Sequence, residues 1–378
     1  MNQIQKKFFL CYFESTRNCN LDCPYCMARL PQTHKNNGKT ELTGDEIKHL
    51  IVDELKKYSS TGAIAFSGGE HLLREDALEI LKYTADSGLW SFINTNGSLL
   101  NKKLVKKINE VTGGKVIFVF SLNSINPKIH KWSRNDSINT IAKAAKLCLK
   151  EKINFFFILT ISKNNLHTLK ETVQFLKEKD VPLLRSPFVL RGSGKIHEGL
   201  LFTKDDMKNI IHPVLREYPL SYVSYTPFFA APELIQNTWN TMNVEIGQLG
   251  CQAAKGFIGI SAEGDVAPCV HLLDNGLNCG NVKEIPLTKI LAENPTLNTI
   301  RDRNNLKGKC NICRYRDTCG GCRALAYYKS GDYLAEDPTC FFEPIDKTTK
   351  SEHEQVQNEN MVKFIEFIKS HKPWSSLF

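Results

Sequence analysis

The sequence predicts an α/β fold followed by a small cysteine-rich domain, and three observations support this prediction. Between residues 8 and 216, short β-rich apolar runs alternate with amphipathic helical patterns, which is typical of repeated βα units around a parallel sheet. The 378 residues exceed the usual size of one domain. Cysteines become dense from Cys251 onward. Periodicity alone therefore predicts an α/β barrel or a doubly wound sheet for the larger part.

The strands of this sheet are predicted from runs rich in β-branched and aromatic residues. Helix starts follow the expected signals, because Thr43 precedes Asp45 and Glu46, and Asp76 precedes the helical pattern of 77–85. The predicted strands lie near 8–14, 63–67, 90–95, 116–122, 154–160 and 183–190.

Composition and charge exclude several classes of protein. The net charge of +9 is scattered, and short clusters such as Lys102-Lys103 and Lys106-Lys107 lie on a predicted helix, so they indicate a solvated face. There is no basic stripe with interleaved aromatic residues to predict nucleic-acid binding. No apolar run reaches the roughly 18 residues that span a membrane. Thirteen cysteines without a secretory signal favour metal binding in a reducing compartment, so we expect a cytoplasmic protein.

The motif that organises the chain is Cys19-Asn-Leu-Asp-Cys23-Pro-Tyr-Cys26, a Cys-x3-Cys-x2-Cys spacing directly after the first predicted strand. Three thiolates on so short a loop can bind three corners of a [4Fe-4S] cube and leave the fourth iron open, whereas most clusters have four cysteine ligands. Ferredoxins use a tighter run, and no histidine follows to complete a zinc finger. Free or zinc-binding thiols are the alternative.

This motif, with Tyr25 before its third cysteine, resembles the radical S-adenosylmethionine (SAM) superfamily. The resemblance implies a partial (β/α)6 barrel in which the amino and carboxylate groups of SAM chelate the open iron. In barrels of this kind, functional groups lie on the loops after the strands. Further motifs follow the next strands, and the cofactor-binding residues implied by the resemblance are Tyr25, Ser67, Gly68, Gly69, Glu70, Asn96, Ser121 and Arg134.

Each of these motifs has its own chemical reason. The glycines of the Ser-Gly-Gly-Glu turn ending at Glu70 let backbone carbonyls approach an ammonium group, and the family's turn contacts the amino group of SAM. Arg134 suits a bidentate grip on the carboxylate of SAM. The Thr-Asn-Gly turn at Asn96 is equally an ordinary turn before a helix. The chain departs from the family at His71, where Pro is frequent, and at Asn123, where Asp is common.

A second array of cysteines occupies the C-terminal part of the chain. Paired Cys-x2-Cys units are usual zinc ligands, so zinc is the chemical alternative. The order of residues resembles the SPASM domain, an extension of radical SAM enzymes that carries one or two auxiliary iron-sulfur clusters. By that pattern the first auxiliary cluster is one ligand short, with Cys279 as the nearest candidate for the fourth ligand. The implied ligand sets are Cys251, Cys269 and Cys322 for the first cluster, and Cys310, Cys313, Cys319 and Cys340 for the second.

The resemblances divide the chain into four parts. They are a radical SAM core barrel at 1–216, a bridging segment at 217–250, an auxiliary cluster domain at 251–345, and a C-terminal helix and tail at 346–378. The aromatic residues of the bridging segment either line a substrate cavity or pack against the second domain. Cys11 and Cys148 have apolar neighbours and are predicted to be core thiols.

The implied chemistry is reductive cleavage of SAM to methionine and a 5′-deoxyadenosyl radical that abstracts a substrate hydrogen. A reducing partner such as flavodoxin or ferredoxin would supply the electron. The auxiliary clusters would accept the substrate electron or anchor the substrate. No acid–base pair is identifiable. His271, two residues after Cys269, is a candidate proton acceptor, although a lone histidine of this kind is usually structural.

The substrate class follows less directly. We rank peptide or protein maturation by crosslinking, oxidation or epimerisation first, because it is the broader class. The Cys-Gly-Gly-Cys-Arg stretch at 319–323 also resembles enzymes of the alternative haem and haem d1 pathways, which act on propionate side chains of a tetrapyrrole. That small-molecule reading is the runner-up. A non-catalytic iron-sulfur electron carrier or a zinc-binding module is the alternative of another class, but neither needs an open iron or a Gly-Gly-Glu turn.

Overall fold

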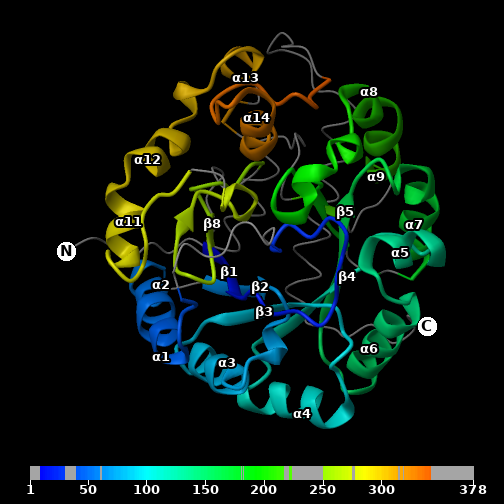
Figure 1. The fold of residues 1–378 in the computed structure, drawn as a ribbon, viewed down its shortest axis with the longest axis vertical. Coiled ribbons are helices and arrows are strands. Elements are labelled where there is room, and N and C mark those ends of the chain that lie inside the picture. The colour runs from blue at the N-terminus through cyan, green and yellow to red at the C-terminus, as the bar shows by residue number, and fades with distance from the viewer. Residues whose placement is uncertain are drawn as a thin grey trace, which may run out of the picture.

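A single mixed sheet forms the centre of the molecule, and helices surround it (Figure 1). The computed structural model describes residues 9–29, 40–59, 62–179, 181, 183–216, 221–223, 250–274, 277–313, 316–317 and 319–341. Among these residues the sheet has nine strands, in the order β7-β6-β5-β4-β3-β2-β1-β8-β9. The larger part of the chain is therefore a partial barrel, as predicted.

The six predicted strands all form, and neighbouring strands from β1 to β6 pair in parallel. The observed bounds differ little from the predicted ones, and β3 matches residue for residue. These strands are β1 Phe9–Thr16, β2 Gly62–Gly68, β3 Trp90–Thr95, β4 Val116–Ser121, β5 Phe155–Ile161 and β6 Leu183–Pro187.

The core lies between the strands and the helices that cover them. Parallel sheets are covered on both faces, so their strands are nearly continuous apolar runs. The ring of Phe120 in β4 lies 5.6 Å from that of Phe155 and 6.3 Å from that of Phe157 in β5, measured between centroids. All three side chains are fully buried. Each such phenylalanine contributes about 1.5–3 kcal/mol through burial, which explains why these runs form strands.

The helices begin where the sequence signals predict. Thr43 and Glu46 form a capping box, in which Glu46 N donates to Thr43 Oγ1 at 3.2 Å. Asp76 precedes α3, but its carboxylate binds Arg74 instead of capping the helix. The lysines of α4 are exposed while Val105 is buried, which confirms the solvated face. The helical elements of this part are α1 Gly44–Glu46, η1 Ile47–Val52, α2 Asp53–Tyr58, η2 His71–Leu73, α3 Ala77–Asp86, α4 Lys102–Val111, α5 Pro127–Arg134, α6 Ile138–Lys150, α7 Leu166–Glu178, η3 Gly192–Ile196, η4 Glu198–Leu200, α8 Lys204–Asp206, η5 Met207–Ile211 and α9 His212–Arg216.

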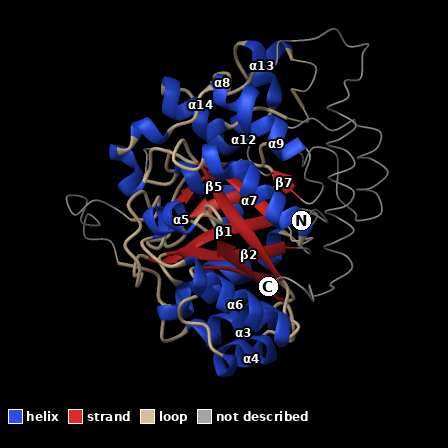
Figure 2. Ribbon diagram, turned by 90° about the vertical axis from the view of Figure 1, so that its right-hand side faces the viewer, coloured by secondary structure: helices blue, strands red, loops and turns tan. Residues whose placement is uncertain are grey.

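The C-terminal part of the chain extends the barrel sheet. β8 (Phe257–Ile260) lies parallel beside β1, and β9 (Val266–Ala267) is antiparallel to β8. α11 packs beside α2, where Thr288 Oγ1 donates to Glu54 Oε2 at 2.6 Å. Figure 2 shows α13 and α14 at the end of the molecule opposite α3 and α4. The helical elements of this part are η7 Val270–Leu272, α11 Leu287–Glu293, α12 Pro295–Arg301, η8 Arg303–Asn305, α13 Lys309–Ile312 and α14 Arg323–Ser330.

Two predicted parts lie largely outside the described residues. Of the bridging segment 217–250, the structure describes β7 (Ser221–Val223), which pairs in parallel with β6, and residue 250. The C-terminal helix and tail predicted at 346–378 lies wholly outside. In the part of the chain that the structure describes, no helix combines the length and apolar character needed to cross a membrane.

Candidate functional site

The first cysteine motif lies on the loop that leaves the carboxyl end of β1. Cys19 is exposed, Cys26 is half-buried and Cys23 is buried. Cys26 N donates to Cys23 O at 3.3 Å, which turns the loop back on itself. Burial raises the pKa of both Cys19 and Cys23, and the neighbouring Cys26 thiol raises both further. The loop therefore gathers the three predicted ligands and leaves one of them open to solvent.

The Gly-Gly-Glu turn after β2 lies directly against this loop. Gly69 N donates to Thr16 O at 2.7 Å, and Glu70 N donates to Asn18 O at 2.7 Å. A Cβ atom on Gly69 would lie 1.9 Å from Asn18 O, so the position admits no side chain. The preceding Gly68 has φ +95°, in the left-handed region that favours glycine. The turn is thus glycine-rich because the cysteine loop approaches its backbone.

The Glu70 carboxylate joins a third motif to these two. It is buried, and it accepts hydrogen bonds from Thr95 Oγ1 at 2.8 Å and Asn96 N at 3.0 Å. Burial raises its pKa, although these hydrogen bonds act in the opposite direction. Asn96 Nδ2 in turn donates to Asn20 Oδ1 at 2.9 Å. The Thr-Asn-Gly turn therefore lies at the cysteine loop and is more than an ordinary turn before a helix.

Helix α5 brings Arg134 to the other side of the loop. The Cys23 thiol donates to the backbone carbonyl of Arg134 at 3.4 Å. Burial lowers the pKa of the Arg134 guanidinium, but the thiols of Cys23, Cys26 and Cys19 outweigh this and raise it. Arg134 is thus a cation close to the predicted cluster ligands. Ser121 is the half-buried last residue of β4, the strand that precedes α5.

Asn123, where the family commonly has Asp, supports Tyr25. Its side-chain nitrogen lies 3.0 Å from the Tyr25 hydroxyl and donates to it, and its oxygen accepts from Thr160 N at 3.0 Å. Tyr25 is buried, which raises its pKa to about 12, and its ring lies 5.6 Å from that of Trp132. Asn123 thus holds the aromatic residue of the cysteine motif against β5 and α5, without adding a charge.

His71, where the family often has Pro, has a structural explanation. Its Nδ1 lies 2.8 Å from Ser15 Oγ, and its ring stacks on Phe66 at 4.5 Å. Burial lowers its pKa to about 3, so the imidazole is neutral. Ser67, at the end of β2, donates to the Tyr12 hydroxyl at 3.1 Å. Both contacts fasten the Gly-Gly-Glu turn to β1.

The auxiliary cysteines separate into two groups. The thiol charges of Cys251 and Cys269 act on Cys322, so these three lie near one another. The charges of Cys340 and Cys310 act on Cys319. Burial is the first cause that raises the pKa of both Cys322 and Cys319. These two groups are those that the SPASM resemblance implies, with Cys313 in the second set by resemblance alone. The ligand roles themselves stay predictions.

The Asp337 carboxylate links the segment of Cys322 to the segment that precedes Cys340. Asp337 Oδ2 accepts from Cys322 N at 2.7 Å, and Asp337 Oδ1 accepts from Thr339 N at 2.8 Å. The Asp337 side chain is buried. In addition, Cys251 N donates to Cys319 O at 2.8 Å. Segments distant in sequence thus meet at the Cys-Gly-Gly-Cys turn, whose Gly320 and Gly321 have φ +71° and +58°.

The remaining sequence-predicted residues have clear surroundings. The ionisable group beside Cys279 is Arg301, and burial raises the pKa of this thiol to about 12. His271 is buried, with its Nε2 3.0 Å from Ser186 Oγ and its Nδ1 3.6 Å from the Cys269 sulfur. Burial lowers the His271 pKa to about 3. Cys11 and Cys148 have no exposed surface, which confirms them as core thiols.

The donors fit clusters better than single metal ions. In the described ranges, no three His, Cys, Asp or Glu side chains converge closely enough to hold one ion. A cubane binds each thiolate at a different iron, so its ligands stand farther apart than those of one ion. Groups of neighbouring thiols are the donor set of an iron-sulfur cluster, and the His271 imidazole lies beside one of them, Cys269. The residues present therefore fit the implied groups.

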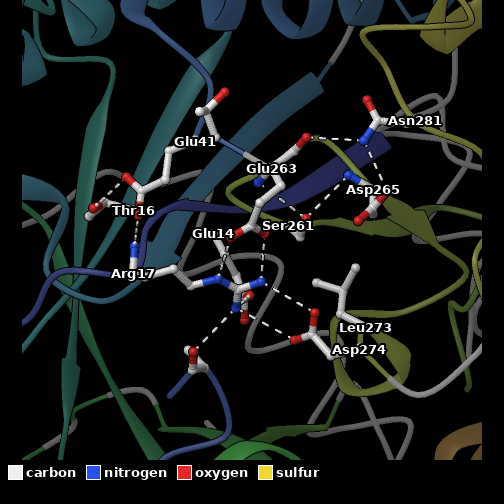
Figure 3. Close-up of polar contacts among 12 residues, drawn as sticks. Glu14, Thr16, Arg17, Glu41, Ser261, Glu263, Asp265, Leu273, Asp274 and Asn281 are labelled. Carbon is white, nitrogen blue, oxygen red and sulfur yellow. Dashed lines mark hydrogen bonds and ion pairs between the residues drawn. The ribbon is translucent and has the colours of Figure 1, made fainter. Parts of the chain in front are cut away.

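Sequence reasoning missed a charged network that joins the first cysteine loop to the C-terminal domain (Figure 3). Arg17, two residues before Cys19, donates to Glu14 Oε2 at 2.8 Å, to Glu263 Oε2 at 2.8 Å and to Asp274 Oδ1 at 3.2 Å. It also donates to Ala28 O at 3.2 Å. Burial lowers the pKa of Arg17, but these carboxylates outweigh it and raise the value. No local pattern signals pairs that lie so far apart in sequence.

A second arginine completes this network. Arg191, after β6, has no exposed side-chain surface. Its Nη1 and Nη2 donate to the two oxygens of Glu14 at 2.6 and 2.8 Å, and its Nε donates to Leu273 O at 2.9 Å. Buried charges are tolerated when they are paired in this way. The network of Glu14, Arg17, Arg191, Glu263 and Asp274 thus joins β1 and the cysteine loop to the segment after β6 and to the C-terminal part of the chain.

Comparison with known proteins adds two family models. The radical SAM superfamily model matches residues 13–176, and SPASM, an iron-sulfur cluster-binding domain, matches residues 251–320. AdoMet-dependent heme synthase of Methanosarcina barkeri is 31% identical over 345 residues, which cover 88% of this chain and 96% of that protein. PqqA peptide cyclase of Bradyrhizobium diazoefficiens is 23% identical over 380 residues, which cover 93% and 91%.

A solved structure shares the fold. Streptococcus suis SuiB bound to S-adenosylmethionine matches with a TM-score of 0.66 and 17% identity, over 89% of this chain and 78% of that one. At this identity the match supports the architecture alone.

Proposed function

Because this chain belongs to the radical SAM superfamily and carries a C-terminal SPASM domain, we propose that it oxidises propionate side chains of a tetrapyrrole. The chain is a radical SAM enzyme. The observation that carries the substrate proposal is the match to AdoMet-dependent heme synthase, which extends over 96% of that protein at 31% identity.

The order of relatives reverses the ranking that the sequence favoured. Peptide or protein maturation came first there only because it is the broader class. PqqA peptide cyclase matches at 23% identity, well below the heme synthase. Peptide modification remains the second candidate, because that match covers 93% of this chain.

The cofactors define the reaction, and the chain's residues position them. When bound, a [4Fe-4S] cluster with SAM supplies a 5′-deoxyadenosyl radical that removes a substrate hydrogen, and auxiliary clusters take up the electron left behind. In the proposal Cys19, Cys23 and Cys26 hold the first cluster. The Gly-Gly-Glu turn, whose backbone lies against this loop, would bind the amino group of SAM, and Arg134 would bind its carboxylate.

The chemistry of a propionate suits this reaction. A propionate that loses a hydrogen atom, an electron and carbon dioxide becomes a vinyl group, so one radical event and one electron acceptor account for each side chain. The net charge of +9 favours an acidic substrate over a basic one. The cysteines of the first auxiliary set, Cys251, Cys269 and Cys322, are all buried, and they suit electron acceptance because burial keeps solvent from the centre they would hold.

The direct test is turnover with a defined porphyrin. The protein is reconstituted anaerobically with iron and sulfide, reduced, and mixed with SAM and iron coproporphyrin III. We expect 5′-deoxyadenosine together with a porphyrin that has lost one carbon dioxide and two hydrogen atoms per converted side chain, both measured by mass spectrometry. The Cys148→Ala variant, which alters only a core thiol, serves as a matched cysteine control and should behave like the wild type.

Two results would contradict the tetrapyrrole proposal in different ways. If 5′-deoxyadenosine forms but the porphyrin mass stays unchanged, the tetrapyrrole proposal fails and the peptide candidate replaces it. If neither product forms with a fully loaded, reduced protein, the porphyrin is not a substrate that supports SAM cleavage, and the proposal fails as well.

A further inference from the structure

Arg303, the first residue of η8, is a buried arginine that has no carboxylate partner among the described residues. Its side chain is 3% exposed. Its Nη2 donates to the backbone carbonyl of Cys251 at 2.5 Å. In the part of the chain that the structure describes, its Nε and Nη1 have no hydrogen-bond partner. Burying a guanidinium with two unsatisfied nitrogen donors costs several kcal/mol, so native proteins rarely contain one.

The ionisable groups around Arg303 are two cysteines and a second arginine. Burial is the main cause that lowers its pKa, the thiols of Cys251 and Cys319 raise it, and the neighbouring Arg323 lowers it further. Its guanidinium also lies against the Cys-Gly-Gly-Cys turn, since a Cβ atom on Gly320 would be 2.3 Å from Nη1. Arg303 thus lies where the Cys251 segment and the turn ending at Cys322 meet.

Three other arginines, Arg17, Arg191 and Arg323, have hydrogen-bond partners for their guanidinium groups, and buried Arg323 donates to the backbone carbonyls of Tyr333 and Ala335. Arg17 and Arg191 are each bound by carboxylates, as Figure 3 shows for Arg17. The carboxylates of Asp302 and Asp337 accept hydrogen bonds from other groups. Asp302 accepts from Asn304 N, and Asp337 accepts from Cys322 N. A negative, sulfur-rich acceptor beside Cys251 would satisfy both free N–H groups and the charge, and an iron-sulfur cluster is such an acceptor.

We propose that Arg303 donates N–H groups to sulfur atoms of the auxiliary cluster on Cys251, Cys269 and Cys322, and that its positive charge raises the reduction potential of this cluster. Hydrogen bonds to sulfur and nearby positive charge both stabilise the reduced, more negative state. Arg303 is therefore a positioning and tuning residue for the electron acceptor. The proposal concerns the auxiliary cluster, so it stands or falls independently of the substrate.

The test is the reduction potential of the auxiliary clusters. Replacing Cys19, Cys23 and Cys26 with alanine removes the first cluster, so that redox titration followed by electron paramagnetic resonance reports the auxiliary clusters alone. In this background, Arg303→Leu removes both charge and donors, and Arg303→Lys keeps the charge with fewer donors. We expect a lower midpoint potential for Arg303→Leu and a smaller decrease for Arg303→Lys, with iron and sulfide content checked for each.

Lys307→Met is the control. Lys307 lies four residues away, but its side chain is exposed and its Nζ donates to Asp332 Oδ2 at 2.6 Å. Its loss should leave the midpoint potential unchanged. An unchanged potential in both Arg303 variants, or an equal decrease in Lys307→Met, would overturn the proposal. If Arg303→Leu does not retain its clusters, Arg303→Lys decides: a decrease supports the proposal and an unchanged value refutes it.

Discussion

The two cysteine-rich regions of this protein differ in how they are assembled and how far they are opened to solvent. The first trio lies on one eight-residue loop, with Cys19 exposed and Cys26 half-buried. In the auxiliary array, Cys251, Cys269, Cys310, Cys319 and Cys322 are buried, Cys313 and Cys340 are half-buried, and the residues come from segments up to about ninety residues apart.

This difference corresponds to different chemical tasks. A cluster that binds SAM at an open iron needs an accessible corner, and the exposed end of the first loop provides one. A cluster that only passes electrons functions in a sealed environment, where hydrogen bonds and charge set its potential. The cations differ accordingly, because Arg134 lies half-buried beside the first loop whereas Arg303 is buried within the array.

The largest expected effect tests whether the two regions are separable. In the Cys19→Ala, Cys23→Ala, Cys26→Ala triple variant, we expect 5′-deoxyadenosine formation to fall to background because the open iron is lost. The auxiliary iron and sulfide should remain, since their predicted ligands belong to another part of the chain. Iron analysis and product quantification measure both. SAM cleavage retained by the variant would contradict the assignment of the first loop.

The next effect concerns the charged network that joins the regions. Arg191→Met leaves the buried Glu14 without its bidentate partner, so we expect the free energy of unfolding to fall by about 3–5 kcal/mol. Unfolding of the reconstituted protein measures this loss. Lys128→Met, on the exposed side of α5, is the surface control and should stay within about 0.5 kcal/mol of wild type. An equally small effect for Arg191→Met would show that the charged network does not stabilise the contact between the cysteine loop and the C-terminal part of the chain.

A smaller effect is expected from the packing of the first loop. Asn123→Ala removes the acceptor of Thr160 N and the donor to the Tyr25 hydroxyl, at a cost of roughly 2–3 kcal/mol. Because Tyr25 precedes Cys26, we also expect less iron at the first cluster but unchanged auxiliary iron. Asn304→Ala, at an exposed position, is the comparison variant. Equal loss of iron from both regions would indicate general unfolding instead.

The smallest effect depends on pH. Burial lowers the pKa of His71 to about 3, whereas the unfolded chain titrates near its ordinary value of about 6.5. The unfolded chain therefore binds the proton more readily between these values. Stability from the neutral imidazole is complete above about pH 6.5 and falls by roughly 2 kcal/mol at pH 5.

His71→Phe keeps the stack on Phe66 and removes the titration. We expect its unfolding temperature to decrease less than that of the wild type between pH 7 and pH 5. Parallel decreases in the two proteins would assign the acid sensitivity to other groups.

The sequence by itself determined what depends on neighbours along the chain. β3 matches its prediction residue for residue, because a parallel strand is a short apolar run whose pattern is local. The Cys19 to Cys26 spacing and the Gly-Gly-Glu turn are local as well, so both motifs could be identified from the sequence, and their binding roles stay predictions. The capping box at Thr43 follows from residues three apart.

Only the tertiary structure decided which distant side chains meet. The division of the auxiliary cysteines into two groups was implied by resemblance, but their proximity depends on Asp337 and on the Cys251 to Cys319 hydrogen bond. The pairing of Arg17 with Glu263 spans 246 residues, and the surroundings of Arg303 arise only after the chain folds. Burial sets the energy of such charges, and burial is a property of the folded chain that no local pattern encodes.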